Sequence, residues 1–263
     1  ITNILLSLTF VLIFQMQING IALASVVAEI IGMIIGFIYV CKELQKYQGK
    51  WIYKEIVRLN AYKRFMQINI NLFLRTIALI FTFAFITAQG ARFGGIILGA
   101  NALLMNLQNL LAYVLDGFAH AAEALVGKAV GKKNTRLFKS AVHICLKWSV
   151  YIALIFSLIY ALMGKYLIPL MTHHQNIRDI AIEYLPWMII SPIVSVWSFL
   201  YDGVFVGATR SREMRNAMLG SLFLVFLPSW YFLQPFHNHG LWLAFTLFMF
   251  SRSLSMHLLY KKI

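Results

Sequence analysis

Long apolar runs separated by short polar segments dominate the chain. They cover residues 2–17, 20–41, 66–90, 97–127, 141–164, 180–208, 214–234 and 241–260. Most exceed the ~20 residues that a helix needs to cross a bilayer. Continuous runs of this length also exclude barrel strands, leaving helices as the way to span lipid. The pattern therefore predicts an all-α integral membrane protein with about eight transmembrane helices.

Composition supports this class and excludes a soluble domain. Hydrophobic residues make up 60% of the chain and charged residues only 12%, whereas a soluble domain is nearer half apolar and a quarter charged. So few charges cannot cover a water-facing surface, so membrane lipids are the first expected partner.

The net charge of +14 is explained by where the basic residues lie. They gather in residues 42–64, 128–139, 210–215 and 261–262, while the connections between these segments carry few. This alternation follows the positive-inside rule. It predicts a multi-pass protein of the inner or plasma membrane with these segments and the C-terminus in the cytoplasm. No basic face interleaved with aromatic residues indicates a nucleic-acid partner.

The connection over residues 46–65 is longer than the others and is predicted to be a cytoplasmic amphipathic linker. Apolar residues are spaced among its lysines, a pattern typical of a helix lying at the membrane interface. These apolar residues are Trp51, Ile52, Ile56, Val57, Leu59 and Tyr62.

The first apolar run begins directly at Ile1 and lacks the basic region and cleavage site of a signal peptide. We therefore expect the chain to be part of a longer polypeptide. The segments INGIALAS (18–25) and NHGLWLAF (238–245) share three residues at equal spacing, beginning with Gly20 and Gly240. This weak match suggests a repeat of 220 residues, the kind of duplication that many transporters show.

Ionisable residues deep in the apolar runs are the candidates for function. They are Glu29, Arg75, Asp116, Glu123, Lys147 and Asp202. Such residues usually face a bundle interior or a cavity and often mark an ion or substrate path. On a helix, Asp116, His120 and Glu123 share one face. The alternative is an internal ion pair, such as Arg75 with Asp116, that only stabilises helix packing.

The chemistry that these residues suggest is ion transfer rather than catalysis. A carboxylic acid in apolar surroundings can take up and release a proton, whereas three ligands on one helix seldom converge on a metal without a partner helix. No GxSxG, HExxH or phosphate-binding glycine loop is present, so we expect no enzyme, metal or cofactor. Pro186 and Pro192 lie in the same run as Asp202 and predict a bent helix.

Three segments resemble one transporter family. YDGVFVGATRSREMRNAM (201–218), YVLDGFAHAAEALVGKAVG (113–131) and NINLFLRTIALIFTFAFITAQGARFG (69–94) resemble the DinF branch of the MATE (multidrug and toxic compound extrusion) transporters. The resemblance covers essentially the whole chain and matches helices 5 to 12 of a twelve-helix fold. That fold has two six-helix lobes around a central cavity.

The resemblance implies a division of the chain into parts of these lobes. Residues 1–45 would be the last two helices of the N-terminal lobe, the first of them truncated, and residues 46–65 the linker. Residues 66–263 would be the C-terminal six-helix lobe. The missing N-terminal lobe would then be a partner of this segment.

The resemblance also implies export of organic, often cationic or amphipathic, compounds in exchange for protons or sodium. By position, Asp202 matches the cation-linked acid on helix 10 of other branches. Asp116 and Glu123 match acidic positions on helix 8, and Arg75 matches an arginine on helix 7. Replacing Asp202 by Asn is expected to abolish ion-driven efflux if this acid titrates, and to abolish expression if it is structural.

This chain departs from the family pattern at two positions. The helix-7 glutamate of sodium-linked branches is absent, with apolar residues such as Leu79 nearby. His120 stands where an aromatic residue is more usual, which places its role in doubt.

Two further functions stay open. A wide basic cavity would favour a related exporter of lipid-linked oligosaccharides. The lack of a water-filled cavity around Asp116 and Asp202 would favour a non-transporting membrane scaffold.

Overall fold

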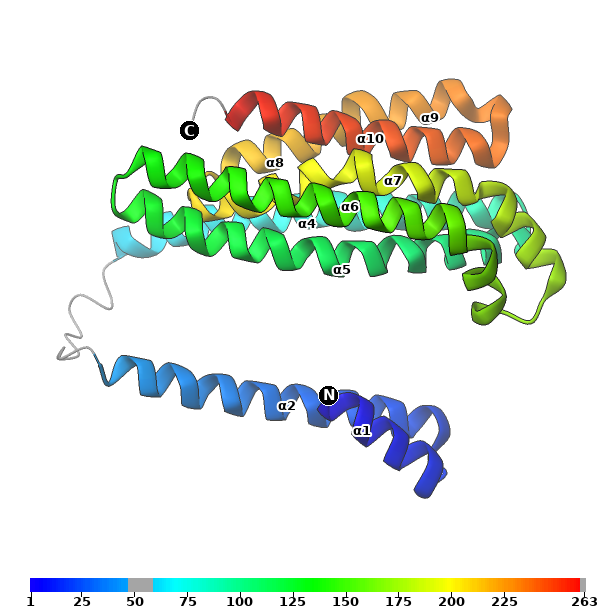
Figure 1. The fold of residues 1–263 in the computed structure, drawn as a ribbon, viewed down its shortest axis with the longest axis horizontal. Coiled ribbons are helices and arrows are strands. Elements are labelled where there is room, and N and C mark those ends of the chain that lie inside the picture. Colours follow the sequence, from blue (N-terminus) through cyan, green and yellow to red (C-terminus); the bar gives the residue numbers. More distant parts are fainter. Residues whose placement is uncertain (47–58, 261–263) are drawn as a thin grey trace. The chain divides into compact units, whose positions relative to one another are not determined.

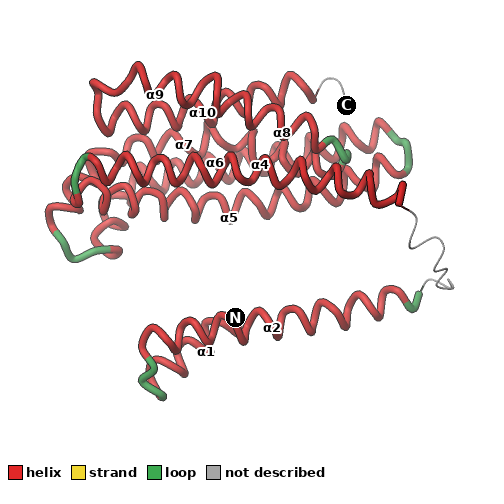
Figure 2. The backbone as a smooth tube through the Cα atoms, turned by 180° about the vertical axis from the view of Figure 1, so that it is seen from behind, coloured by secondary structure: helices red, strands yellow, loops and turns green. Residues whose placement is uncertain are grey.

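The computed structural model describes residues 1–46 and 59–260, which are almost entirely helical (Figures 1 and 2). The elements are α1 (Thr2–Leu8), the π-helix η1 (Thr9–Ile13), α2 (Gln17–Leu44), α4 (Leu59–Arg92), α5 (Gly95–Gly131), α6 (Thr135–Met171), α7 (Gln175–Gly207), α8 (Ser211–Gly220), the π-helix η2 (Ser221–Phe226), α9 (Leu227–Leu233), the 3-10 helix η3 (Gln234–Phe236) and α10 (His237–Tyr260). The predicted apolar runs lie almost entirely on helix, so the all-α membrane fold is confirmed.

Six helical stretches of the described residues are long and apolar enough to cross a membrane. The last of them, Ser211–Tyr260, turns back at η3. Its second part, α10, packs against η2, α9 and α8. This stretch therefore contains two antiparallel crossings, as the two separate apolar runs 214–234 and 241–260 predicted.

The helices extend beyond the apolar runs. Helix α4 begins at Leu59, seven residues before the predicted start and inside the predicted linker. The reason is that hydropathy marks the part of a helix in hydrocarbon, while backbone hydrogen bonding continues into the polar interface. The rest of the predicted amphipathic linker, residues 47–58, lies outside the described residues.

The chain divides into two units, Ile1–Leu59 and Asn60–Ile263. In the first unit, α1 and η1 pack against α2. The chain turns between η1 and α2, where Gln15 and Gln17 have positive φ. Almost all of α2 is exposed within this unit, and only Gly20 and Ala24 are buried.

Helix α7 is the centre of the second unit. It packs against α5, α6 and α10, and it buries a polar and charged series that includes Ser195, Ser198 and Asp202. Apolar side chains of the neighbouring helices close around it in three clusters. The polar side chains of α7 therefore face protein rather than lipid, the arrangement expected inside a membrane bundle.

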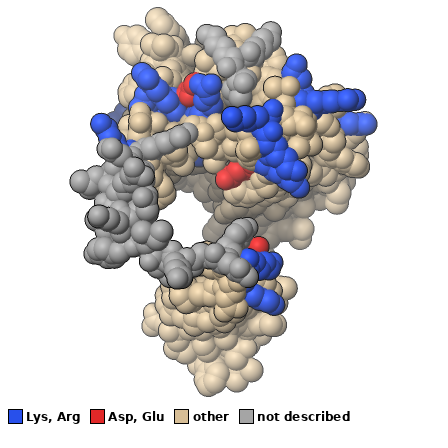
Figure 3. All heavy atoms as spheres, turned by 90° about the vertical axis from the view of Figure 1, so that its left-hand side faces the viewer, with Lys and Arg blue, Asp and Glu red and all other residues tan. Residues whose placement is uncertain are grey.

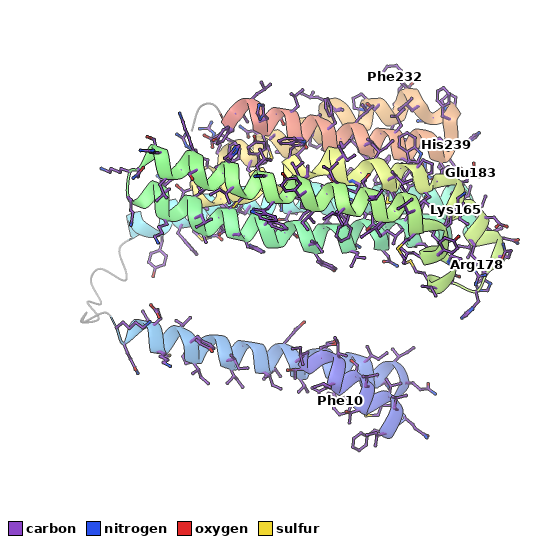
Figure 4. All side chains as sticks on the ribbon, viewed as in Figure 1. Phe10, Lys165, Arg178, Glu183, Phe232 and His239 are labelled. Atoms are coloured by element: carbon purple, nitrogen blue, oxygen red, sulfur yellow. The ribbon has the colours of Figure 1, made fainter. Side chains whose placement is uncertain are left out.

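The basic segments of the second unit lie at one end of its bundle. This end carries the α5–α6 turn with exposed Lys128, Lys132, Lys133 and Arg136, and the start of α8 with exposed Arg212. Figure 3 looks onto this end and shows the blue side chains gathered there. Lys165 and Arg178, labelled in Figure 4, lie at the opposite end. The uneven distribution read from the sequence is thus a distribution between two ends of one bundle.

The 220-residue repeat suggested by the sequence recurs as backbone geometry within each unit. Gln17 has φ 46° and His237 has φ 48°, and each stands three residues before a glycine. A Cβ on Gly20 would lie 2.9 Å from the Met16 Cβ, and one on Gly240 would lie 2.1 Å from the Leu233 carbonyl oxygen. Each unit therefore has a turn in which a residue with positive φ precedes a crowded glycine by three positions.

Candidate functional site

Three helices of the second unit bring charged side chains together inside the bundle. Arg75 of α4 and Arg252 of α10 each donate a hydrogen bond from Nη2 to Oδ2 of Asp202 on α7. Both contacts are also ion pairs. We call Arg75, Asp202 and Arg252 the charged triad.

The triad is shielded from the exterior of the bundle. Arg252 is 1% exposed and Asp202 is 8% exposed. The Arg252 guanidinium also lies 5.9 Å from the centre of the Phe199 ring, a cation–π geometry. Among the described residues, Oδ1 of Asp202 and Nε of Arg75 are buried without a hydrogen-bond partner. Because a buried charge needs a partner to be tolerated, each member of the triad depends on the others.

Close packing of α7 on α5 places this triad next to the acidic stripe of α5, which consists of Asp116, His120 and Glu123. Gly203 and Gly207 are four residues apart on α7, the small-xxx-small spacing that lets membrane helices approach closely. A Cβ on Gly203 would lie 2.0 Å from the Ala119 carbonyl oxygen, and one on Gly207 would lie 2.5 Å from that of Glu123. Only glycine allows this contact, which begins one residue after Asp202.

The acidic stripe itself is more open than the triad. Asp116 and Glu123 are half-buried, and His120 is exposed. Nδ1 of His120 lies 3.6 Å from Oε2 of Glu123. Asp116 lies within electrostatic reach of all three triad members and of His120.

The structure thus brings together three of the sequence-predicted candidates, Arg75, Asp202 and Asp116, but pairs them differently from the internal pair named as an example. Arg75 pairs with Asp202, not with Asp116. The Arg75–Asp116 pair named as an example was wrong, because sequence positions on separate helices do not show which helices meet. Here the side chain of Arg75 on α4 reaches Asp202 on α7. Among the described residues, His120 and Glu123 form an ion pair with each other and none with the triad.

Sequence reasoning missed Arg252. It stands at the twelfth position of the run 241–260, in MFSRSLSM, and is as deep in an apolar run as Arg75. The signal was present, because a charge in the middle of a membrane span is costly wherever it occurs. Counting basic residues only near the ends of the runs concealed it.

A second group of polar side chains lies nearer the start of α7 than Asp202 does. Ser191 donates a 2.5 Å hydrogen bond to Oε1 of Gln108 on α5, and Ser157 of α6 donates one of 2.6 Å to the Ile189 carbonyl. Pro192 removes the backbone donor that would reach Met188. Pro186 and Pro192 lie inside one continuous helix, Gln175–Gly207, and the Ser157 hydroxyl donates to the carbonyl of the residue that follows Met188.

A pocket of about 410 Å³ lies between α7 and α10. Its walls are mainly apolar, with Ser253 and His257 as the polar members. His257 Nδ1 shares a 2.7 Å hydrogen bond with the Tyr201 hydroxyl. Among the described residues, no group of three or more His, Cys, Asp or Glu side chains is placed to hold a metal ion. The buried ion pairs of the charged triad, together with Asp116, make this region the candidate ion site of the unit.

The chain is similar to a protein family and to curated proteins. The MatE family model matches residues 72–231. The chain is 38% identical to DNA damage-inducible protein F of Escherichia coli (strain K12) and 23% identical to Protein DETOXIFICATION 42 of Arabidopsis thaliana. These alignments cover 100% and 96% of this chain but 57% and 48% of the relatives. The chain thus spans about half the length of these relatives.

Solved structures show the same fold. The Vibrio cholerae MATE transporter VcmN in its bent form aligns with a TM-score of 0.81 at 19% identity. The eukaryotic MATE transporter AtDTX14 aligns with a TM-score of 0.87 at 15% identity. Each alignment covers 99% of this chain and 59% of the other. The family model, covering more than half of the chain, and the shared helical architecture lead to one conclusion: the chain belongs to the MatE family of membrane transporters.

Proposed function

We propose that the whole protein is a secondary active antiporter that exports organic, often cationic or amphipathic, compounds in exchange for protons or sodium. The observation that carries this proposal is the buried Arg75–Asp202–Arg252 triad in a membrane-spanning bundle. Family membership supports the transport class.

A purely structural role explains the triad less well. A packing pair needs one cation for each anion, but here two guanidinium groups share one carboxylate. The excess positive charge is costly in hydrocarbon and is typical of ion or substrate paths. A half-buried carboxylate, Asp116, lies within its field. An arrangement of this kind suits ion exchange better than a scaffold.

The same excess positive charge favours a second candidate function. Two arginines would also suit the phosphate of a lipid-linked oligosaccharide, because guanidinium groups bind phosphate well. Export of such a compound belongs to the same class of transport but to a different substrate chemistry.

Transport assays with the full-length protein in proteoliposomes would test both candidates. We expect an imposed proton or sodium gradient to drive efflux of a fluorescent organic cation, and a phosphate-linked lipid to be left in place. Movement of the phosphate-linked lipid alone would support the second candidate. No gradient-dependent movement of either compound would contradict the antiporter.

The chain by itself should not transport. In a two-lobe fold the cavity lies between the lobes, so one wall is absent when only this segment is made. Efflux by the isolated chain would contradict the two-lobe arrangement.

We further propose that the basic end of the bundle faces the cytoplasm of a multi-pass inner or plasma membrane protein, with the C-terminus on that side. The concentration of Lys and Arg at the α5–α6 turn (Figure 3) supports this orientation. Single cysteines placed between residues 128 and 139 should react with an impermeant reagent only after the membrane is opened. Strong labelling in intact cells would reverse the orientation.

A further inference from the structure

The pocket between α7 and α10 is an open groove, which we call the α7–α10 groove. Ile193, Val194 and Trp197 of α7 form one wall, and Phe250 and Leu254 of α10 form the other. Ile193 is 46% exposed, Phe250 53% and Leu254 47%. Both helices belong to stretches that are long and apolar enough to cross a membrane. The groove is therefore an open apolar surface within the membrane-spanning part of the second unit.

The groove offers a free hydrogen-bond donor at one end. Inside it, Ser253 already donates its hydroxyl to the Val194 carbonyl oxygen at 3.0 Å. At its end, Nδ1 of His257 lies 2.7 Å from the Tyr201 hydroxyl, which has no other hydrogen-bond partner among the described residues. Tyr201 is 2% exposed, and a buried tyrosine hydroxyl needs a partner, so this hydroxyl donates to Nδ1. The imidazole proton then lies on Nε2, which forms no hydrogen bond within the described part of the chain.

This polar end of the groove lies at the basic end of the bundle. Helix α10 ends at Tyr260, at the same end of the bundle as the α5–α6 turn (Figures 1 and 2). The Tyr260 ring stacks on that of Phe138 of α6, with ring centres 5.9 Å apart. The next residue of α6, Lys139, is exposed. Tyrosine is typical of the membrane–water interface, so the His257 donor lies at headgroup depth beside a basic segment.

The length of the groove fits the upper part of one acyl chain. From His257 back to Phe250, α10 runs seven residues away from the basic end, which is about 10 Å of helix. One leaflet of the hydrocarbon core is about 15 Å deep. A donor at headgroup depth followed by apolar walls matches the order of chemistry along a phospholipid.

We propose that the α7–α10 groove binds one anionic phospholipid, with an acyl chain against its apolar walls and with a phosphate oxygen that accepts a hydrogen bond from Nε2 of His257. Charge complementarity selects an anionic lipid, because basic residues at the membrane surface attract anionic headgroups. The lipid comes from the leaflet at the basic end of the bundle. The groove contains no member of the charged triad, and its occupancy does not depend on transport.

Photo-crosslinking of the full-length protein in proteoliposomes tests this site. A diazirine in the acyl chain of phosphatidylglycerol forms adducts with neighbouring side chains, and peptide mass spectrometry locates them. We expect adducts concentrated on residues 193–197 and 250–257. Phosphatidylcholine carrying the same diazirine should give about fivefold fewer, the difference that one nearby basic residue makes for an anionic lipid.

Three results would overturn the proposal. Even labelling of all exposed apolar positions would show ordinary contact with the bilayer. Equal labelling of the groove by both lipids would show that no anionic headgroup is recognised. A groove without adducts would show that protein, such as a second copy or another part of the polypeptide, covers it.

Substitutions that fill the groove separate binding in it from contact with the bilayer. Leu254→Trp fills it from α10 and Ile193→Trp from α7, and each should abolish the concentrated adducts. Leu162→Trp is the matched control on α6, because Leu162 is 66% exposed and does not line the groove. It should leave the adducts unchanged. Adducts that persist in either filled variant would contradict the site, and Ile193→Trp decides alone if Leu254→Trp does not fold.

Variants at the polar end test the headgroup contact. His257→Phe removes the donor and should lower the adducts of both lipids about tenfold, the value of a hydrogen bond to a charged group. His257→Gln keeps an acceptor for Tyr201 and an N–H donor for phosphate, so it should label as the wild type does. Lys139→Gln should lower the adducts of phosphatidylglycerol alone. Wild-type labelling in His257→Phe, or equal losses in His257→Phe and His257→Gln, would refute the phosphate contact.

Discussion

Helices α2 and α10 begin 220 residues apart in the sequence, and the first residue of each, Gln17 and His237, has a positive φ. Within their own units they bury very different side chains. Helix α2 buries only Gly20 and Ala24, whereas α10 buries aromatic, sulfur-containing and charged side chains along its length.

The difference is visible residue by residue. In α10, Trp242, Phe248 and Arg252 are buried, and the residues 220 positions earlier are Ala22, Ala28 and Gly32. Helix α2 is also more apolar than α10, although it is far less buried. In lipid, apolar side chains need not be inside, but polar ones do. The two helices therefore share a backbone turn but carry different side chains at the positions that α10 buries.

Truncating an aromatic side chain should give the largest difference in stability between α10 and α2. Phe248 is 0% exposed and packs on the rings of Phe226 and Phe245, while Phe37 of α2 is 69% exposed. We expect Phe248→Ala to lower the free energy of unfolding by about 3 kcal/mol, because it leaves a cavity. Phe37→Ala should cost less than about 0.5 kcal/mol. Unfolding by SDS in mixed micelles would measure both, and equal losses would contradict the contrast.

Substituting the turn glycines should give losses of stability that differ less between the two helices. Gly240→Ala places a Cβ 2.1 Å from a backbone carbonyl oxygen, and Gly20→Ala places one 2.9 Å from the Met16 Cβ. We expect losses of about 2 and about 1 kcal/mol, because a crowded helix contact must move apart.

Gly36→Ala is the matched control for the turn glycines. A Cβ there meets nothing within 4 Å, so unfolding by SDS in mixed micelles should show no loss of stability. A loss in Gly240→Ala without any loss in Gly20→Ala would show that the two turns are not equivalent.

The smallest expected effect concerns a polar pair that only α10 possesses. Asn238 and Asn101 exchange hydrogen bonds of 2.8 and 3.0 Å, and the Trp242 indole donates another of 3.0 Å to Asn101. We expect Asn238→Ala to cost about 1 kcal/mol, the usual size for hydrogen bonds between membrane helices. Ile18→Ala, 220 residues earlier and 81% exposed, should cost nothing measurable. A double substitution with Asn101→Ala should be less than additive if the pair acts as a unit.

The candidate site was only partly predictable. Asp202, Arg75 and Asp116 stand out because each is a charge within an apolar run, and all three lie within reach of one another. Arg252 completes the triad, and no spacing in the sequence links residue 252 to residue 202. The close contact of Gly203 with Ala119 likewise depends on how two helices meet and has no local signature beyond the glycine spacing.

The sequence by itself determined that this protein is a membrane bundle, where its helices lie along the chain, and that its basic residues gather at one end. These properties follow from the cost of placing each residue in hydrocarbon, which is set residue by residue. Only the tertiary structure decided which charges are partners. Asp202, held by two arginines, and Asp116, which forms no ion pair among the described residues, both lie within apolar runs and differ in which neighbouring helices pack against them.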